Sequence, residues 1–175
     1  IAGNELLRQG QLKDAQRELI GALAMRPGDP KVLALLGISY FRGGQFNEAR
    51  PIYQELVAQV PQDASHRLNL GLVHLKLGDA AAAIVELEKS RDLDPSQGRA
   101  VSYLGLAYAR SGRFVEAYQG FLMAGQDDLA TEIEEQVPVA ERERIRALVR
   151  GVPSEEISAE PAAPIAAPPS ESQQF

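Results

Sequence analysis

The sequence repeats itself every 34 residues, and this period constrains the fold more than any other feature. Gly, Ala and Pro all keep the same step, in four series: Gly3, Gly37, Gly71 and Gly105; Gly10, Gly44, Gly78 and Gly112; Ala15, Ala49, Ala83 and Ala117; and Pro27, Pro61 and Pro95. A fixed period of this length is the signature of stacked supersecondary units. We therefore expect a linear array of similar units, with no separate globular core.

Each periodic residue predicts a local structure. The first Gly lies inside a helix, where it costs roughly 1 kcal/mol relative to Ala, so we expect a second helix to approach closely there. The second Gly precedes a new helical run, which is typical of a left-handed C-terminal cap. The Ala allows two helices to cross closely, and the Pro ends each unit because it cannot continue a helix.

Apolar residues between these positions recur with the helical period. Leu33, Leu36, Tyr40 and Phe41 form one such stripe. The expected helices cover about residues 1–9, 12–25, 30–43, 46–59, 64–77, 80–93, 98–111 and 114–124. Pro51 lies beyond the first turn of its helix, so we expect a local bend there.

The motif Leu36-Gly37-x-x-Tyr40, followed by Gly44, Ala49, Tyr53 and Pro61, resembles the tetratricopeptide repeat (TPR). The next two units match it with changes: repeat 3 has His74 in the place of Tyr40 and Leu87 in the place of Tyr53, and repeat 4 has Phe121 in the place of Tyr53 and Leu129 in the place of Pro61. The chain is identified as a member of the TPR family. The resemblance implies an all-α TPR superhelix, which is an α-solenoid of antiparallel helical hairpins that binds another protein. The bias toward Ala, Leu, Gly and Arg favours a bacterial origin.

Three segments follow from these patterns. The array covers residues 1–125, with a truncated repeat at 1–29 and further repeats at 30–63, 64–97 and 98–125. Residues 126–150 form acidic capping helices, the first at about 127–137 with Leu129, Ile133 and Val137 on one stripe, and the second at about 139–150. Residues 151–175 are rich in Pro, Ala, Ser and Glu, so we expect a disordered tail or a linker.

Charge and composition exclude several classes of protein. Residues 1–125 carry a net charge of +1 and residues 126–175 a net charge of −7, so we expect no nucleic-acid binding. No apolar run is long enough to span a membrane. The absence of Cys excludes disulfides and fits a reducing compartment, so we expect a cytoplasmic protein. The first residue is Ile1, and we expect the natural chain to begin further upstream.

The sequence predicts no enzyme, cofactor or metal site. It contains no zinc-protease, nucleophile-elbow, P-loop or dinucleotide-binding motif. Of its two His residues, we expect His66 to be exposed and His74 to pack in the core.

The predicted functional surface is a groove. In the TPR family the first helix of each repeat lines the concave face, and the resemblance places these residues there: Leu35, Ile38, Phe41, Arg42, Leu68, Asn69, Leu72, Leu75, Lys76, Arg99, Ser102, Tyr103, Leu106 and Arg110. Two periodic series stand out, namely an apolar strip (Ile38, Leu72 and Leu106, with Phe41 and Leu75) and a basic ladder (Arg8, Arg42, Lys76 and Arg110). The strip is also explained by packing, and the ladder by the helix dipole. Together they favour a partner helix or extended segment with apolar anchors and acidic flanks.

Some TPR domains clamp the C-terminal carboxylate of a chaperone with Lys, Asn and Arg. Asn69 and Arg99 match that pattern, but Ala34, Ile38 and Tyr103 do not, so we do not expect such a clamp.

Three hypotheses of function remain. The array is an adaptor that binds a partner segment in its groove, or the helix at about 139–150 docks into the groove of its own chain (autoinhibition) or of a neighbouring chain (self-association), or the array is the regulatory arm of a larger protein or enzyme.

Overall fold

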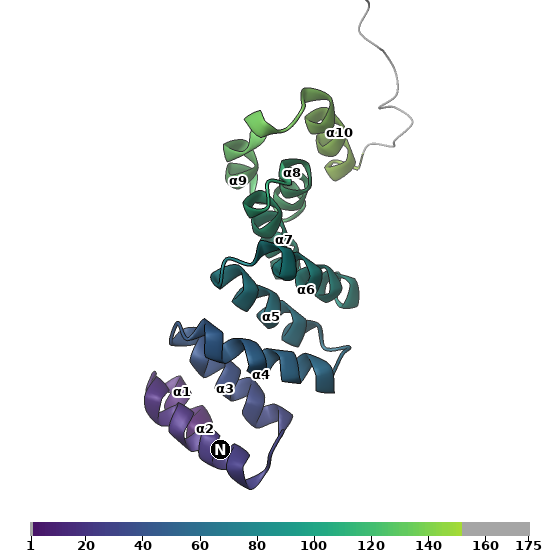
Figure 1. Cartoon of the computed structure of the whole chain (residues 1–175). Coiled ribbons are helices and arrows are strands. Elements are labelled where there is room, and N and C mark those ends of the chain that lie inside the picture. The colour runs from purple at the N-terminus through teal and green to yellow at the C-terminus, as the bar shows by residue number, and fades with distance from the viewer. Residues whose placement is uncertain (1, 152–175) are drawn as a thin grey trace, which may run out of the picture.

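A computed structural model of the protein describes residues 2–151, which form an all-α stack of antiparallel helix pairs (Figure 1). The helices are α1 (Ala2–Arg8), α2 (Leu12–Met25), α3 (Pro30–Arg42), α4 (Phe46–Gln59), α5 (Ala64–Lys76), α6 (Ala80–Leu93), α7 (Gly98–Arg110), α8 (Phe114–Met123), α9 (Asp127–Glu132), the 3-10 helix η1 (Glu134–Gln136) and α10 (Val139–Val149). None of the helices within residues 2–151 has the length and apolar character that crossing a membrane requires.

Four helix pairs form the repeats: α1 and α2 are repeat 1, α3 and α4 repeat 2, α5 and α6 repeat 3, and α7 and α8 repeat 4. The buried side chains fall into three clusters, and each cluster crosses a junction between repeats. Leu7 and Leu36 belong to the first, Leu56 and Val73 to the second, and Leu87 to the third. The core of each repeat is therefore continuous with that of its neighbour, as in other solenoids.

The periodic glycines behave as their positions predict. A Cβ at Gly71 would lie 2.6 Å from Cγ of Leu87, and one at Gly105 would lie 2.6 Å from Cδ1 of Phe121. Only a residue without a side chain permits this approach of the two helices. Gly78 and Gly112 end first helices with φ of 83° and 76°, which is the left-handed region that favours Gly.

Short polar side chains and proline set the boundaries of the repeats. Asp29 accepts hydrogen bonds from the backbone N–H groups of Lys31 and Val32, and Asp63 accepts one from His66, so both cap first helices. α4 runs without interruption through Pro51, so the bend expected there does not break the helix.

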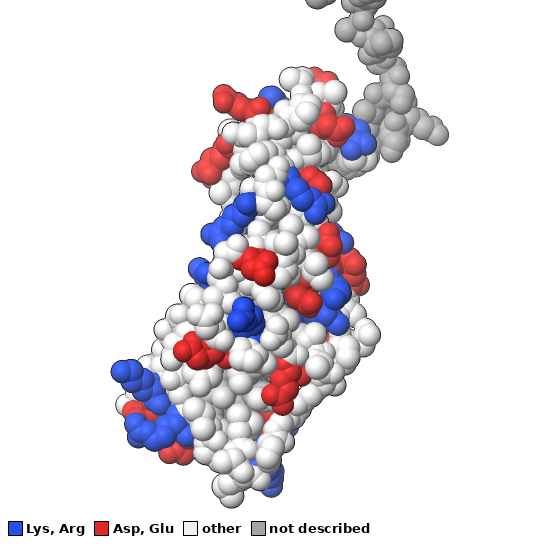
Figure 2. Space-filling model, viewed as in Figure 1, with Lys and Arg blue, Asp and Glu red and all other residues white. Residues whose placement is uncertain are grey.

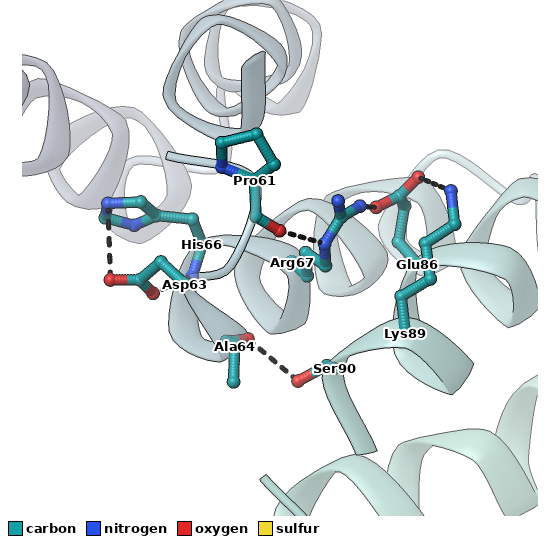
Figure 3. Close-up of polar contacts among 8 residues, drawn as sticks. All are labelled: Pro61, Asp63, Ala64, His66, Arg67, Glu86, Lys89 and Ser90. Atoms are coloured by element: carbon teal, nitrogen blue, oxygen red, sulfur yellow. Dashed lines mark hydrogen bonds and ion pairs between the residues drawn. The ribbon is translucent and has the colours of Figure 1, made fainter. Parts of the chain in front are cut away.

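Polar contacts fasten the two helices of repeat 3 to the preceding turn (Figure 3). The Arg67 guanidinium donates to the carbonyl oxygen of Pro61 and pairs with Glu86, both over 2.9 Å. His66 is not exposed as expected, because its side chain folds back toward Asp63 and only 17% of it remains accessible. His74 packs in the core, as predicted, with 9% of its surface exposed.

The first capping helix is shorter than expected. A single helix over 127–137 is wrong, because α9 ends at Glu132 and the one-turn η1 follows it. Pro138 disfavours helical backbone at the residue before it, and Val137 is indeed extended. Val137 is nevertheless buried, and Leu129 and Ile133 pack against the third cluster.

The second capping helix, α10, packs against α8 and not along the first helices of its own chain. Ile145 is its buried anchor, with 1% of its surface exposed. Arg146 and Arg142 pair with Glu134 of η1 over 2.6 and 3.7 Å and hold α10 to the preceding turn. The predicted tail, from Val152 onward, lies outside the described residues.

Candidate partner-binding surface

The first helices of repeats 2–4 carry charge of one sign only. Helices α3, α5 and α7 contain no Asp or Glu between their bounds, and each carries two cations: Lys31 and Arg42, Arg67 and Lys76, and Arg99 and Arg110. The acidic residues of these repeats lie on the second helices and in the turns, among them Glu48, Glu55, Glu86, Glu88 and Glu116. A helix row with one sign of charge attracts groups of the opposite sign.

The charge is not uniform over the whole surface. On the face drawn in Figure 2, basic and acidic side chains alternate and much of the area between them is uncharged. This face therefore lacks the broad positive patch of a nucleic-acid-binding protein. The exclusively positive charge is therefore found along α3, α5 and α7, and not over this face as a whole.

The predicted apolar strip is interrupted in repeat 3. Ile38 is 38% exposed and Leu106 is half-buried, but Leu72 and Leu75 are only 7% and 4% exposed. The expectation of a continuous exposed strip is therefore wrong at α5. Here the apolar face of α5 joins the core cluster of repeats 3 and 4, to which Leu68 also belongs.

Two arginines of the basic ladder link neighbouring repeats. The guanidinium of Arg42 donates to the carbonyl oxygen of Leu7 over 2.9 Å, and that of Arg110 donates to Leu75 over 2.8 Å. Arg8 lies 3.6 Å from Glu5, while Lys76 is exposed and forms no ion pair or side-chain hydrogen bond within residues 2–151. The helix dipole is therefore not the whole explanation of the ladder.

A hollow of about 390 Å³ opens beside the first helix of repeat 4. One wall is the exposed side of α7, and the predicted residues Arg99, Ser102, Tyr103 and Leu106 all lie on it. The structure thus brings together four of the five residues that the sequence assigned to repeat 4. Arg110, the fifth, is exposed at the far end of the same helix.

The other walls of this hollow come from residues that the sequence analysis did not select. Phe121 and Ala124 come from the end of α8, and Gln126 and Leu129 from α9 and the residue before it. The early break at Gly125 was the available signal, since it predicts that α8 stops short. What the sequence did not show is that this break leaves space next to α7.

The remaining predicted groove residues differ in accessibility. Phe41 is half-buried and meets Phe46 edge to face, with ring centroids 5.4 Å apart. Leu35 and Asn69 are also half-buried. Only Leu68, Leu72 and Leu75 lie in the core and are withdrawn from any surface that a partner reaches.

The pKa of Tyr108 is shifted by a polar cluster that Tyr108 forms with Glu88 of α6 and with Arg113, the residue before α8. The Tyr108 hydroxyl donates to Glu88 over 2.6 Å, and the Arg113 guanidinium lies 4.5 Å from the centre of its ring. Burial, followed by the hydrogen bond to Glu88, raises the pKa of Tyr108 to about 12. No group of His, Cys, Asp and Glu side chains within residues 2–151 is arranged to hold a metal ion.

Comparison with known proteins gives the family of the repeats. A family model described as the tetratricopeptide repeat matches residues 2–64, 34–96 and 68–128. The three matches overlap and together cover the four helix pairs.

Curated proteins with similar sequences are longer than this chain. A TPR repeat-containing protein of Pseudomonas aeruginosa is 32% identical over 120 residues, which are 69% of this chain and 47% of that protein. The inactive TPR repeat-containing thioredoxin TTL3 of Arabidopsis thaliana is 29% identical over 98 residues, 56% of this chain and 14% of that protein. The cellulose synthase 2 operon protein C of Komagataeibacter xylinus is 32% identical over 95 residues, 54% and 7% respectively. The chain thus spans less than half of each of these relatives.

Solved structures of MamA share the fold. MamA of Desulfovibrio magneticus RS-1, from residue 41 to its end, is 20% identical with a TM-score of 0.63, over 90% of this chain and 74% of that one. A second structure, MamA AMB-1, is 25% identical with a TM-score of 0.65, over 79% and 72%. At these identities the likeness concerns the arrangement of the helices.

Proposed function

Because the chain belongs to the tetratricopeptide-repeat family, whose fold supports binding between proteins, we propose that its first helices bind an acidic, partly apolar segment of another protein. The observation that carries this proposal is the charge of α3, α5 and α7, which have no Asp or Glu and carry five exposed Lys or Arg residues besides Arg67, which pairs with Glu86. Complementary charge selects partners and directs their approach. A row of helices without a single acidic residue disfavours basic segments and favours acidic ones.

Accessible apolar side chains lie on the same helices as these charges. Ile38 on α3, and Tyr103 and Leu106 on α7, are exposed or half-buried, so they are available to anchor apolar residues of a partner. Leu72 and Leu75 are core residues and take no part in this surface. The proposed surface therefore has apolar contacts at repeats 2 and 4, with Lys76 and the half-buried Asn69 between them.

Selection from a random peptide-display library tests the proposed chemistry without a known partner. The immobilised protein should enrich peptides that combine Asp or Glu with bulky apolar residues. The variant Ile38→Glu/Leu106→Glu should bind the enriched peptides at least tenfold more weakly. Leu72→Glu is unsuitable for this purpose, because a charge at a buried position would unfold the repeat.

A matched control separates charge from apolar contact. The variant Lys76→Glu/Arg99→Glu reverses the charge of two exposed cations and keeps the apolar residues. The enriched peptides should therefore change from acidic to neutral or basic. Reversal of the exposed Arg50 on the second helix α4 should change nothing. Enrichment of basic peptides by the unaltered protein would contradict the proposal.

Self-association through α10 is a second candidate. Met123, Leu148 and Val149 are 60%, 44% and 42% exposed and lie beside one another around a hollow between α8 and α10. An apolar cluster of this kind can pair with a copy of itself. Light scattering of the full chain should then give a dimer for the unaltered protein and a monomer for Leu148→Glu, and a monomer for both would exclude this candidate.

A third candidate is that the array is the regulatory arm of a larger protein. The relatives from Pseudomonas, Arabidopsis and Komagataeibacter all extend well beyond the matched region, which supports this view. The complete reading frame tests it directly, because a regulatory arm requires a further domain in the same chain.

A further inference from the structure

The second helix of repeat 4 is shorter than its counterparts. α4 and α6 each have 14 residues, whereas α8 has 10 and ends before Gly125, whose φ is 67°. Ala124 and Gln126 therefore lie outside a helix at repeat positions where Ser90 and Asp92 continue α6. Repeat 4 lacks the last turn of its second helix.

In the preceding repeat this last turn covers the start of the first helix. Because the two helices are antiparallel, the end of α6 lies beside the beginning of α5, and the hydroxyl of Ser90 donates to the carbonyl oxygen of Ala64 over 2.8 Å. Ser90 is fully buried by this contact. In repeat 4 the equivalent residue is Ala124, which has no hydroxyl and is only half-buried, and the start of α7 faces the 390 Å³ hollow instead.

The same difference appears on the first helices. Ser102 and Leu106 of α7 occupy the repeat positions of Leu68 and Leu72 of α5. Leu68 and Leu72 are buried against the next repeat, whereas Ser102 and Leu106 are half-buried and line the hollow. A position that packing fills in repeat 3 is thus open in repeat 4.

The lining of this hollow combines flat apolar walls with one unmatched polar atom. Tyr103, Leu106, Phe121 and Leu129 supply aromatic and aliphatic surface. The side-chain oxygen of Gln126 is buried and has no hydrogen-bond partner among residues 2–151. A buried acceptor without a donor is unfavourable by about 1–3 kcal/mol, so a ligand that brings a donor gains more than one that does not.

The charged residues at the rim of the hollow determine which residue of a partner is favoured next to the side chain that inserts into it. Arg99 is exposed and has no carboxylate within 4 Å in the described part of the chain. An acidic residue adjacent to the inserted side chain would meet this free guanidinium. Asp127 and Asp128, on the other side of Gln126, disfavour a second carboxylate there.

We propose that this hollow is a pocket for one Trp or Tyr side chain of the partner, with an Asp or Glu beside it in the sequence. The volume of about 390 Å³ lies within the range of small-ligand pockets, and Trp and Tyr are the aromatic anchors that carry a donor at the end of an apolar ring. The ring packs on Tyr103 and Leu129, its N–H or O–H donates to Gln126, and the carboxylate pairs with Arg99. This inference rests on the proposed function, because it specifies the partner of the same surface.

Two capped peptides test the pocket on the full chain labelled with ¹⁵N. The first is acetyl-Gly-Glu-Trp-Gln-Gly-amide, which has one carboxylate beside the ring, and the second has Leu in place of Trp. In two-dimensional NMR titrations the Trp peptide should shift the amide signals of Ser102, Tyr103, Leu106, Gln126 and Leu129. The Leu peptide, which lacks the N–H of the Trp ring, should bind about tenfold more weakly.

Variants with a matched control locate the contact. Arg99→Glu should weaken binding of the Trp peptide at least tenfold, and Ala124→Phe should abolish it by filling the pocket. Arg50 is likewise an exposed cation, on the second helix α4 and outside the proposed surface, so Arg50→Glu should bind as the unaltered protein does. Circular dichroism checks that each variant keeps its helix content.

Two results would overturn the pocket while leaving the proposed function intact. One is a set of shifts confined to α3 and α5. The other is an equal loss of binding for Arg50→Glu and Arg99→Glu, which indicates charge attraction without a pocket. Equal affinity for the Trp and Leu peptides would overturn the assigned donor to Gln126. Failure of the proposed function is seen separately, in a display selection that enriches no acidic peptides.

Discussion

The guanidinium of Arg110 donates a hydrogen bond to the main-chain carbonyl oxygen of Leu75, which lies 35 residues earlier in the neighbouring repeat, over 2.8 Å. Arg42 and Leu7 form the same contact two junctions earlier, between repeats 1 and 2. Each of these carbonyl oxygens also accepts a backbone hydrogen bond over 3.2 Å, Leu7 from Gly10 and Leu75 from Gly78, so the Arg adds a second donor that comes from the neighbouring repeat. A side chain of the family's groove thereby contributes to the stacking of repeats.

Loss of this contact should destabilise the junction between repeats 3 and 4. We expect Arg110→Ala to lower the free energy of unfolding by about 1–2 kcal/mol, because a charged donor is removed from a partly buried carbonyl. Thermal denaturation followed by circular dichroism measures the effect. Arg50→Ala, at an exposed position on α4, should leave the melting temperature unchanged.

The junction between repeats 2 and 3 allows the converse experiment. Lys76 holds the ladder position there and forms no hydrogen bond to the preceding repeat within the described residues. Since an Arg at this position can reach the carbonyl oxygen of Phe41 as its counterparts reach Leu7 and Leu75, Lys76→Arg should raise stability by about 1 kcal/mol. An unchanged or lower melting temperature would mean that an Arg at position 76 does not form the hydrogen bond to Phe41.

Close helix crossing at Gly71 predicts a cost for any side chain. We expect Gly71→Ala to destabilise the protein by about 1–3 kcal/mol, because the new Cβ would overlap Leu87. Gly21→Ala is the matched control: this Gly also lies within a helix, but a Cβ added there would meet no atom within 4 Å, so Ala should stabilise by about 0.5–1 kcal/mol. Chemical denaturation should give a lower free energy of unfolding for Gly71→Ala and a higher one for Gly21→Ala than for the unaltered protein.

The raised pKa of Tyr108 predicts a loss of stability in alkali. Unfolded Tyr releases its proton near pH 10, whereas Tyr108 in the fold holds it to about 12. Between these values the unfolded chain binds fewer protons than the folded one, so stability present below about pH 10 falls as the pH rises. Melting temperatures between about pH 9 and 12 should fall less steeply for Tyr108→Phe than for the unaltered protein.

The capping helix should be released by one substitution. Ile145→Asp places a charge at the buried contact between α10 and α8, so amide hydrogen exchange in residues 139–149 should accelerate at least tenfold. Leu148→Asp, on the same helix but 44% exposed, should not have this effect. Exchange in repeats 1 and 2 should be unchanged in both, because each repeat is stabilised by its immediate neighbours.

The fold was predictable from sequence because its determinants are local and repeated. Gly at a fixed step predicted both the close crossings and the left-handed caps, and the boundaries of α2 to α7 agree with the expected ranges within about one residue. The region after Gly125 has no repeat to guide it. There α9 ends at Glu132, well before Pro138, and no periodic residue of the sequence marks that end.

The candidate site was less predictable, since it depends on which residues the neighbouring repeats cover. Ile38, Leu72 and Leu106 are equivalent in sequence but differ in exposure: Leu72 joins the core of repeats 3 and 4, Leu106 borders the hollow beside α7, and Ile38 is exposed. Arg42 appeared as a free cation, and its bond to Leu7 follows only from the distance between helices. The pocket of repeat 4 exists because α8 lacks its last turn, and no sequence motif predicts this.

The absence of acidic residues on α3, α5 and α7 has a consequence for rates. Attraction between exposed charges extends over about 8 Å at physiological ionic strength, so an acidic segment is guided toward these helices before it touches them. Added salt should then slow association and leave dissociation, which depends on the apolar anchors, nearly constant. The affinity of this array for its partner would thus follow the ionic strength of its surroundings through the speed of encounter.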